Sequence, residues 1–581
     1  MSDSVGNAGV RNSRRGNWLV TEMASSRDKR TLPRARRPLA LAAVIAAVAA
    51  GALGHRLGGV EDAEGAGTDN VVFILTDDQA FHEMSALPSV RSRIGGEGTT
   101  FKRAYAPYPL CCPARVTTLT GQYMHNHQVR GNGAPYGGWG NFVDQEDDAL
   151  PVWLQDEGYH TVHIGKYMNG YANNVPVPAP VPVGWNEWYG KVSQANLYYD
   201  YALIEDPDGA AGVLPATYES YGSAETDYQT DVLREKAVDF IDGVNPAKTP
   251  FALNFWVNAP HAPFVPAPRD LYKYGGAKLR KLRGFNEKNV RDKPWWLRKQ
   301  ATRLGIGMRK KIAAERRRRL EMLISVDKAV DEILDALESK GILDETYVIF
   351  ASDNGLFRGE HRIVGGKYLA YEPSSHVPLL IRGPGIPAGG TSNELVSLAD
   401  VTQTMVEIAS GSSDPSLDGR SLLPFAKNPG RTSTRPIVLE GDTGPGRGNK
   451  GPEQVRASAA GSVGLAGASG VKNLDQETGV PASVRKSRAH GNNAPAYRGL
   501  RTHSYSYVIY SNGQAELYDM KLDPGQLKNV VRNRRYRKVR RWLFKRLRTY
   551  VNCDAAQCRA QAGVNPKPKK KKKKRRRTRR R

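Results

Sequence analysis

Residues 70–78 have the sequence NVVFILTDD, in which a run of five apolar side chains leads into Thr76, Asp77 and Asp78. A short run that is apolar throughout predicts a strand buried on both faces, as in the parallel sheets of α/β proteins. Three other segments repeat this pattern of an apolar run followed by polar residues: 159–166 (YHTVHIGK), 251–261 (FALNFWVNAPH) and 347–354 (YVIFASDN). The sequence therefore predicts four such strands, each with a polar cluster at its carboxyl end.

Helical patterns lie between these strands. In residues 316–340 apolar side chains recur every three or four positions and form one stripe, with Gly341 as the expected stop. Strands that alternate with helices predict an α/β fold with a large, mostly parallel sheet flanked by helices. Because ligands bind at the carboxyl ends of the strands in such sheets, we expect the four polar clusters to meet in one site.

A second, smaller domain is predicted at the C-terminal end. Residues 504–510 alternate, turn at 511–513 and continue at 516–519, which predicts a hairpin in a small antiparallel sheet. Two segments have the composition of insertions: 265–318 is strongly basic, and 441–495 is rich in Gly, Ala and Ser and is expected to be a mobile loop. The predicted organisation is an export signal or membrane anchor with a linker (1–68), a catalytic domain (69–385), the smaller domain (386–560) and a disordered basic tail (561–581).

The net charge of +27 over 581 residues is concentrated at the two ends of the chain. Residues 567–581 contain thirteen Lys or Arg and no acid, and residues 1–38 contribute +6, which leaves +8 for the rest. A run of like charges repels itself, so the tail is expected to be disordered. Charge alone would let it hold an anionic polymer or a membrane surface, with nucleic acid the partner we expect least. The alternative is a solubilising tail without a specific partner.

Residues 38–54 (PLALAAVIAAVAAGALG) are apolar and follow three arginines within residues 34–37. A basic stretch before a short apolar run of small residues predicts an export signal, and hence an extracellular or cell-envelope protein. The run is at the short end for a membrane span, so an N-terminal anchor and a buried helix are the alternatives. Export would preserve a disulfide between Cys553 and Cys558, and the alternative there is two free thiols.

Residues 111–121 (CCPARVTTLTG) carry the most chemical information. Pro113 suits the first turn of a helix, which places Cys111 at the helix N-terminus, where the dipole and free amides favour negative charge. Arg115 lies one turn further on and is expected to face the same site. An isolated Cys-Cys pair would by itself indicate only two buried thiols before a helix.

This segment resembles the signature of the type I, formylglycine-dependent sulfatases, Cys-x-Pro-Ser/Ala-Arg followed by Leu-Thr-Gly. Cys111 aligns with the signature cysteine and Cys112 with the variable position. The resemblance extends over residues 70–385 and 505–530, is nearest to the N-acetylglucosamine-6-sulfatase and arylsulfatase branch, and implies an alkaline-phosphatase-like fold. It also implies that a formylglycine-generating enzyme oxidises Cys111 to formylglycine, whose hydrated aldehyde supplies the nucleophilic oxygen.

Two polar pairs end predicted strands, Asp77-Asp78 and Asp353-Asn354. Together they offer four oxygen-bearing side chains, which suits a hard cation such as Ca²⁺ or Mg²⁺. Either pair alone would more commonly cap a helix or form a turn. The resemblance implies that these four residues bind one Ca²⁺ beside the formylglycine at position 111.

Sulfate hydrolysis needs positive charge around the non-bridging oxygens. The resemblance implies this role for Arg115, Lys166 and Lys367, and it implies that His261 contacts the sulfate or protonates the leaving group. The implied catalytic residues are Cys111, Arg115, Lys166, His261 and Lys367, and the implied metal ligands are Asp77, Asp78, Cys111, Asp353 and Asn354.

Some positions depart from the family pattern. Many sulfatases have a histidine two residues after the lysine of the Gly-Lys motif, where this chain has Met168, followed by Asn169. The group that assists the aldehyde chemistry is therefore left open. His376 replaces an arginine of many relatives, which leaves a stabilising ion pair near the site in question. His125 and His127 also resemble family positions, and we expect a surface or supporting role for them.

The function that these residues favour is hydrolysis of a sulfate ester, with a sulfated carbohydrate, such as a sugar 6-sulfate or a glycosaminoglycan fragment, or an aryl sulfate as substrate. A phosphonate or phosphate ester hydrolase of the same superfamily is the first alternative, since relatives share the Cys-x-Pro-x-Arg motif. A non-enzymatic protein that binds polyanions through the basic tail and insert is the second.

Overall fold

The computed structural model describes residues 69–172, 180–193, 197–207, 216–247, 249–279, 281–442 and 494–570. The predicted export signal, most of the predicted mobile loop and the end of the basic tail lie outside these residues. Within the described part of the chain, no helix combines the length and the hydropathy that a membrane crossing requires.

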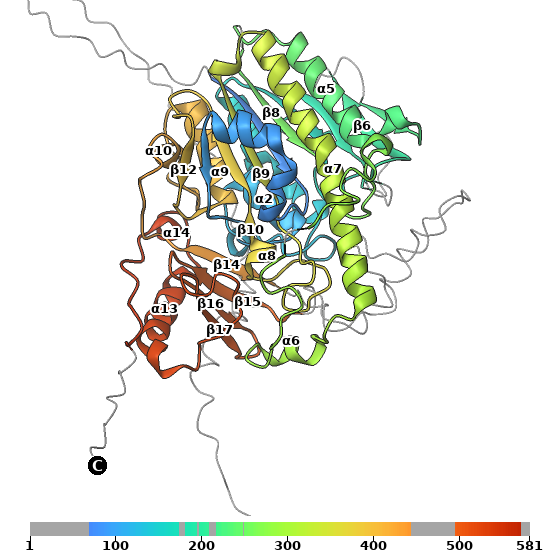
Figure 1. Ribbon diagram of the computed structural model, residues 1–581. Helices are drawn as coiled ribbons and strands as arrows, with labels where there is room; N and C mark the ends of the chain where they lie inside the picture. Colours follow the sequence, from blue (N-terminus) through green and yellow to red (C-terminus); the bar gives the residue numbers. More distant parts are fainter. Residues whose placement is uncertain are drawn as a thin grey trace, which may run out of the picture. The chain divides into compact units, whose positions relative to one another are not determined.

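The centre of the fold is a ten-stranded sheet (Figure 1). Its five middle strands run parallel to one another, and each of the four predicted strands is confirmed among them. In sheet order these are β9 (Thr346–Ser352), β1 (Asn70–Thr76), β8 (Phe251–Trp256), β4 (His160–Gly165) and β5 (Glu187–Lys191). The remaining strands flank them as β12 (Gly390–Ser392), β2 (Thr99–Phe101) and β11 (Leu379–Arg382) beyond β9, and β6 (Tyr201–Asp206) and β7 (Thr217–Tyr221) beyond β5.

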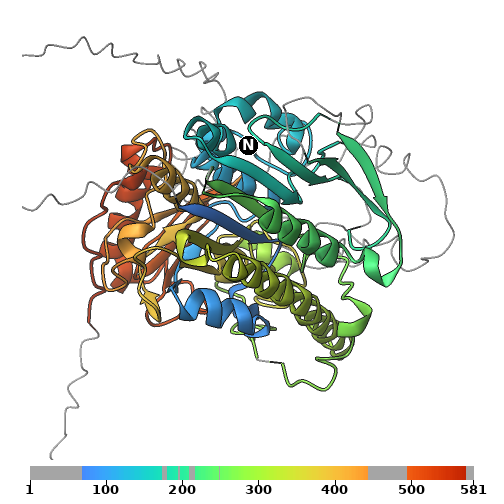
Figure 2. The same cartoon turned by 90° about the horizontal axis from the view of Figure 1, so that it is seen from above.

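Both faces of this sheet are buried, which explains why β1 is apolar at every position from Val71 to Leu75. Odd-numbered residues of β1 pack into one core and even-numbered residues into another. The first core is closed by α2 (Cys111–Thr120), α4 (Leu150–Asp156) and α9 (Leu398–Ser410). The second is closed by α5 (Gln229–Gly243) and by the long α7 (Ile306–Ser339), which contains the predicted apolar stripe (Figure 2).

A separate four-stranded antiparallel sheet follows near the C-terminus, as predicted. It consists of β14 (Ile437–Gly441), β15 (Tyr497–Arg501), β16 (Tyr505–Tyr510) and β17 (Ala515–Asp519). The helix α13 (Arg537–Tyr550) lies beside it. A three-stranded sheet of β10 (His376–Val377), β3 (Ala104–Tyr105) and β13 (Val396–Ser397) completes the sheets, and the short helices are α3 (Met124–His127), α6 (Trp295–Gln300), α8 (Glu372–Ser375), α10 (Leu423–Ala426) and α14 (Ala556–Arg559).

The division between the two predicted domains at residue 386 stays a prediction. Beyond that residue, β12 still pairs with β2 of the large sheet, and α9 still packs against α2. The small antiparallel sheet begins only at Ile437.

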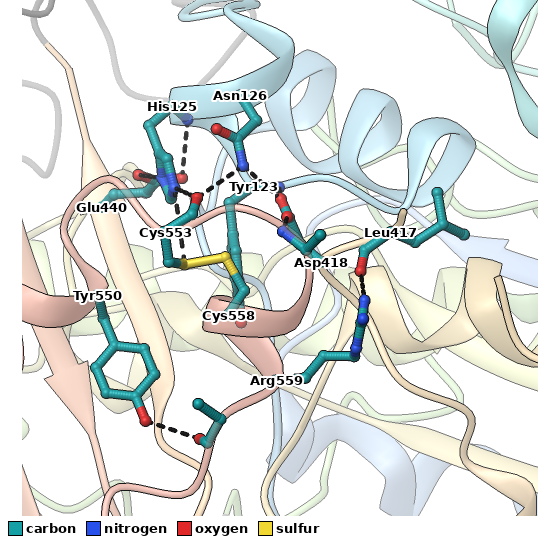
Figure 3. The surroundings of a disulfide bond; sticks show 12 residues. Tyr123, His125, Asn126, Leu417, Asp418, Glu440, Tyr550, Cys553, Cys558 and Arg559 are labelled. Atoms are coloured by element: carbon teal, nitrogen blue, oxygen red, sulfur yellow. Dashed lines mark hydrogen bonds and ion pairs between the residues drawn. A yellow bond between two sulfur atoms is a disulfide. The ribbon is translucent and has the colours of Figure 1, made fainter. Parts of the chain in front are cut away.

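Cys553 and Cys558 form a disulfide, the first of the two states that the sequence left open. The loop that this bond closes is held against α3, which directly follows the Cys111 segment (Figure 3). The carbonyl of Cys553 accepts hydrogen bonds from His125 Nε2 (2.8 Å) and Asn126 Nδ2 (2.9 Å). Because His125 also bonds Glu440 of β14 through Nδ1 (2.8 Å), it links three segments and has a structural role.

Candidate active site

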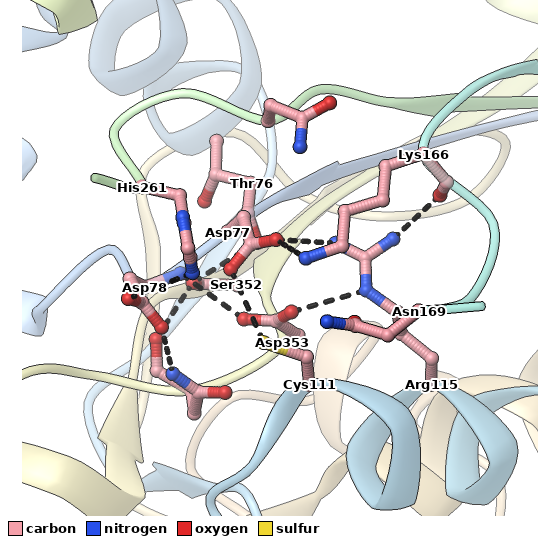
Figure 4. Close-up of polar contacts among 12 residues, drawn as sticks. Thr76, Asp77, Asp78, Cys111, Arg115, Lys166, Asn169, His261, Ser352 and Asp353 are labelled. Atoms are coloured by element: carbon pink, nitrogen blue, oxygen red, sulfur yellow. Dashed lines mark hydrogen bonds and ion pairs between the residues drawn. The ribbon is translucent and has the colours of Figure 1, made fainter. Parts of the chain in front are cut away.

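Two neighbouring parallel strands, β1 and β9, end at the same edge of the large sheet and deliver the two predicted polar pairs there. The backbone N–H of Asp78 donates to Asp353 Oδ1 at 3.1 Å, and Asn354 Nδ2 donates to Asp78 Oδ1 at 2.6 Å. These contacts join residues that are about 275 positions apart in the sequence. Figure 4 shows Asp77, Asp78 and Asp353 converging at this edge.

Helix α2 brings Cys111 to the same point. Cys111 is its first residue and Pro113 lies in its first turn, as predicted. The Cys111 sulfur lies 2.7 Å from Lys367 Nζ and 3.6 Å from Asp77 Oδ1, and it is fully buried. The helix ends at Gly121, whose positive φ of 63° allows its N–H to bond the Thr117 carbonyl, a cap that glycine adopts without strain.

Cationic side chains surround the carboxylates. Arg115 Nε donates to Asp353 Oδ2 (3.1 Å), and its Nη2 lies 3.4 Å from Asp77 Oδ2. Lys166 pairs with Asp77, and Lys367 pairs with Asp78. Three buried carboxylates thus face three buried cations, and this balance is what makes burial of so many charges tolerable.

His261 approaches from the loop after β8. Its Nδ1 lies 2.6 Å from the carbonyl of Ala262, which fixes the Nδ1–H tautomer and leaves Nε2 facing Asp78 Oδ2 at 3.7 Å. Burial lowers the pKa of His261 and outweighs the opposing effect of Asp77. A lowered pKa makes the imidazolium a stronger acid than free histidine.

The surroundings of the site shift the pKa values of its titratable groups in different directions. Burial opposes ionisation of Asp77, but Lys166, His261 and Arg115 together hold its pKa well below the usual range. Burial and the neighbouring Asp77 raise the pKa of Asp353 to about 6. The same two causes raise the pKa of the Cys111 thiol well above its usual value. The unmodified thiol therefore stays protonated at neutral pH and is a poor nucleophile.

The donor set fits a divalent cation with oxygen ligands. Ligand atoms of Asp77, Asp78, Cys111 and His261 all lie within 4.8 Å of one another. The side-chain oxygen of Asn354 is buried and has no hydrogen-bond partner among the described residues. An orphaned buried carbonyl beside two carboxylates is what an oxygen-preferring cation would satisfy.

Comparison with known proteins places this site in a family. The family model described as Sulfatase matches residues 69–412. An N-acetylglucosamine-6-sulfatase from Capra hircus is 31% identical over 519 residues, which cover 87% of this chain and 87% of the relative. The chain belongs to the sulfatase family. The resemblance to its N-acetylglucosamine-6-sulfatase and arylsulfatase branch is thereby confirmed.

Two further relatives show how far the likeness extends. An extracellular sulfatase Sulf-1 homolog from Caenorhabditis elegans is 33% identical. The match covers 61% of this chain and 48% of the length of that sulfatase. A solved structure of a protein in complex with its substrate D-glucosamine-2-N,6-O-disulfate is 22% identical and has a TM-score of 0.63. The match covers 83% of this chain and 98% of the other, so the other protein shares its fold with this chain over nearly its whole length.

All the predicted site residues of this sulfatase are buried and lie at one edge of the sheet, although the role of each stays a prediction. These residues are Asp77, Asp78, Cys111, Arg115, Lys166, His261, Asp353, Asn354 and Lys367. Asn169 also lies close, with its backbone N–H 3.2 Å from the Cys112 sulfur, whereas Met168 is packed into the core.

An arginine of the small sheet pairs with the carboxylate beside His376. Glu372 accepts a hydrogen bond from Arg501 Nε of β15 at 2.9 Å. His376 lies further from Glu372, at 3.4 Å, and its ring stacks on Phe81 and Tyr105.

Sequence reasoning missed Arg319, which supports the site from α7. It is the last of four consecutive arginines, Arg316–Arg319, and directly follows the basic insert at residues 265–318, yet its side chain is fully buried. Arg319 donates to the carbonyl oxygens of Asp78 (2.7 Å) and Pro260 (2.8 Å) and pairs with Glu83. It therefore holds the two segments that carry Asp78 and His261. Helical periodicity was the available signal, since position 319 falls beside the apolar stripe.

Lys191 was also missed, although a repeated Gly-Lys pair could have revealed it. The register of β4 and β5 pairs Gly165 with Gly190, so Lys166 and Lys191 follow at the same edge. Lys191 is 4% exposed, and its amine donates to the Val192 carbonyl at 2.7 Å, with no carboxylate partner among the described residues. Burial and, secondly, Lys166 lower its pKa from 10.5 to about 7.

We expect Lys191→Met to stabilise the fold at pH 7 by about 2 to 4 kcal/mol, because a buried cation without a carboxylate opposes folding. The unfolded chain keeps a proton up to its usual pKa of 10.5, whereas the folded lysine releases it near pH 7. The cost of Lys191 is thus full below pH 7 and shrinks as the pH rises to 10.5. Urea unfolding of both proteins at pH 6.5 and at pH 10 measures this, and a gain that is equal at the two pH values contradicts it.

Proposed function

We propose that this sulfatase hydrolyses sulfate esters with a formylglycine made from Cys111 and one divalent cation, Ca²⁺ or Mg²⁺. The observation that carries the proposal is the position of Cys111 at the start of α2, 2.7 Å from Lys367 Nζ and beside Asp77. A formylglycine at this position would supply a hydrated aldehyde oxygen as nucleophile, which the protonated thiol cannot do. A formylglycine-generating enzyme is the partner that this maturation requires.

The chain's own residues bind and orient the ester. Lys166 and Lys367 offer ammonium groups to the sulfate oxygens, where charge stabilisation has its largest effect. Arg115 holds Asp77 and Asp353 in place. His261 directs its Nε2 into the site, and in its protonated form it would give the Nε2 proton to the leaving alcohol.

The cation would be held by Asp77, Asp78, Asp353 and Asn354, with the modified residue 111 beside it. Its charge would strengthen the attraction for the sulfate. Ca²⁺ and Mg²⁺ both prefer such oxygen donors, so metal analysis of the purified protein is needed to decide between them.

The substrate that we propose is a sulfated carbohydrate, with an aryl sulfate as an artificial equivalent. The name of the Capra hircus relative and the substrate in the solved structure both refer to a 6-sulfated glucosamine unit. The Caenorhabditis elegans relative is described as extracellular, which agrees with the export signal predicted at residues 38–54.

The test is a set of initial rates on matched 4-nitrophenyl sulfate, phosphate and phosphonate esters, together with glucosamine 6-sulfate, using protein from its own host. The proposal expects the highest kcat/KM on the sulfate ester and release of inorganic sulfate from the sugar. A higher kcat/KM on the phosphonate would favour the phosphonate hydrolase alternative. A fully matured protein without hydrolysis of any ester would favour the polyanion-binding alternative.

A further inference from the structure

A second concentration of positive charge lies in the described part of the chain, away from the residues of the site. Residues 528–552 contain eleven Lys or Arg and no Asp or Glu. Helix α13 occupies most of this segment, and its apolar residues Val539, Leu543, Leu547 and Tyr550 are buried. It packs against β15, and Figure 1 shows it beside the small sheet, on the side away from α6 and α8.

The basic residues of α13 form an ordered row on its exposed side. Arg537, Arg541, Lys545 and Arg548 are exposed and follow one another at steps of four, four and three, so they project from one face of the helix. The row is about 16 Å long at the α-helical rise. Arg534 and Lys538 are exposed beside it. We call these six residues the cationic stripe.

Five of the six stripe residues have no carboxylate partner in the part of the chain that the structure describes. Among the described residues, Arg534, Arg537, Lys538, Arg541 and Lys545 form no ion pair with a carboxylate. Some other basic side chains of the protein do have carboxylate partners. Arg93, for example, contacts Asp331, Asp335 and Glu338 at once. Like charges that follow one another along a helix face cost folding free energy through self-repulsion, which an anionic ligand would relieve.

The basic C-terminal tail starts next to this stripe. The backbone N–H of Lys569 donates to the carbonyl of Arg535 at 3.1 Å, and Arg535 Nε donates to the Lys569 carbonyl at 2.6 Å. The carbonyl of Pro566 accepts a hydrogen bond from Tyr505 of β16. Lys569, one of the thirteen tail cations, therefore lies beside the N-terminal end of α13. Two basic segments of the sequence meet at one place.

We propose that the cationic stripe is a second, non-catalytic binding surface for a sulfated polysaccharide, which holds a polymeric substrate while an ester is cleaved at the Cys111 site. The choice of a sulfated glycan rests on the proposed function. Guanidinium groups donate pairs of hydrogen bonds to sulfate and carboxylate oxygens, and a row of them matches a chain with repeated anions. A lipid surface fits less well, because the apolar face of α13 is already buried and cannot enter a bilayer.

The test compares two full-length variants with the same loss of four positive charges. The stripe variant carries Arg537→Gln, Arg541→Gln, Lys545→Gln and Arg548→Gln. The control variant carries Arg298→Gln, Arg303→Gln, Arg309→Gln and Lys310→Gln, which are exposed residues of the other basic segment. Binding to heparin is measured by calorimetry at several salt concentrations, and kcat/KM is measured on 4-nitrophenyl sulfate and on a sulfated polysaccharide.

We expect the stripe variant to bind heparin at least tenfold more weakly, with a shallower salt dependence, because fewer counterions are displaced. Its kcat/KM on the aryl sulfate should stay within twofold of the unaltered protein, and its KM on the polymer should rise. The control variant should change heparin binding less than threefold. If the stripe variant unfolds, a smaller variant with Arg541→Gln and Lys545→Gln takes its place. We expect it to show about half of the increase in log Kd for heparin.

Three results would overturn the inference. These are unchanged heparin binding by the stripe variant, an equal loss in the control variant, or tighter stripe-dependent binding to phosphatidylserine vesicles or duplex DNA than to heparin. Absence of aryl sulfate hydrolysis in all three proteins would instead contradict the proposed function, because heparin binding is measured independently of turnover.

Discussion

The Cys111→Ala variant is expected to lose sulfate ester hydrolysis by about 10⁴-fold or more in kcat/KM, the size of effect seen when a covalent nucleophile is removed. The reason is the geometry at the start of α2. Residue 111 lies between Lys367 and Asp77, and no other nucleophilic side chain among the described residues shares both contacts. Stability should change little, because only one buried sulfur is removed.

Cys112→Ala is the matched control, since it removes the neighbouring buried thiol. The Cys112 sulfur contacts Asn169 instead of the acidic cluster, with the Asn169 backbone N–H at 3.2 Å. We expect less than a tenfold loss of kcat/KM for this variant. Equal losses in the two variants would show that the segment acts through packing alone and would contradict the role of Cys111.

The second large effect is expected for Arg115→Ala. Arg115 is fully buried and joins Asp77 to Asp353, and its Nη1 also donates to the Lys166 carbonyl at 2.6 Å. Its removal leaves two buried carboxylates without their shared cation. Breaking such a buried pair costs about 3 to 5 kcal/mol of the free energy of unfolding. We also expect a loss of roughly 10²-fold to 10³-fold in kcat/KM, the range for one preorganised group.

Arg115→Lys separates charge from geometry. Lysine keeps the positive charge but cannot donate from a planar fork to both carboxylates, so we expect intermediate stability and intermediate activity. Urea unfolding gives the free energy of unfolding, and kcat/KM on the aryl sulfate is measured at saturating Ca²⁺. An Arg115→Ala protein with unaltered stability and turnover would show that the two carboxylates do not depend on this guanidinium.

Much of the central sheet could be predicted, because a strand that is buried on both faces has a continuous apolar run in its sequence. β1 is apolar throughout, and its polar successors Asp77 and Asp78 mark the edge where the strand ends. The outer strands have a weaker sequence pattern. β7 is mostly exposed, so its residues show no apolar run. β12 has only three residues, which is too short for an apolar or alternating pattern.

The polar pairs were predicted from their position at the ends of parallel strands, and Cys111 and Arg115 of α2 from the resemblance to the sulfatase signature. Neither signal covered Arg319, which reaches the site from α7. Arg319 lies within four consecutive arginines, and such a run ordinarily indicates a solvated surface, yet one position of each helical turn must face inward. The cationic stripe on α13 was not predicted either, because its basic residues alternate in the sequence with the buried apolar residues.

The measurement that tests the account most directly is the mass of the Cys111 peptide from catalytically active protein purified from its own host. The account predicts the aldehyde mass at position 111 and a reaction of that peptide with a hydroxylamine reagent, while Cys112 keeps its thiol. An active preparation in which residue 111 carries only an unmodified thiol would contradict the account.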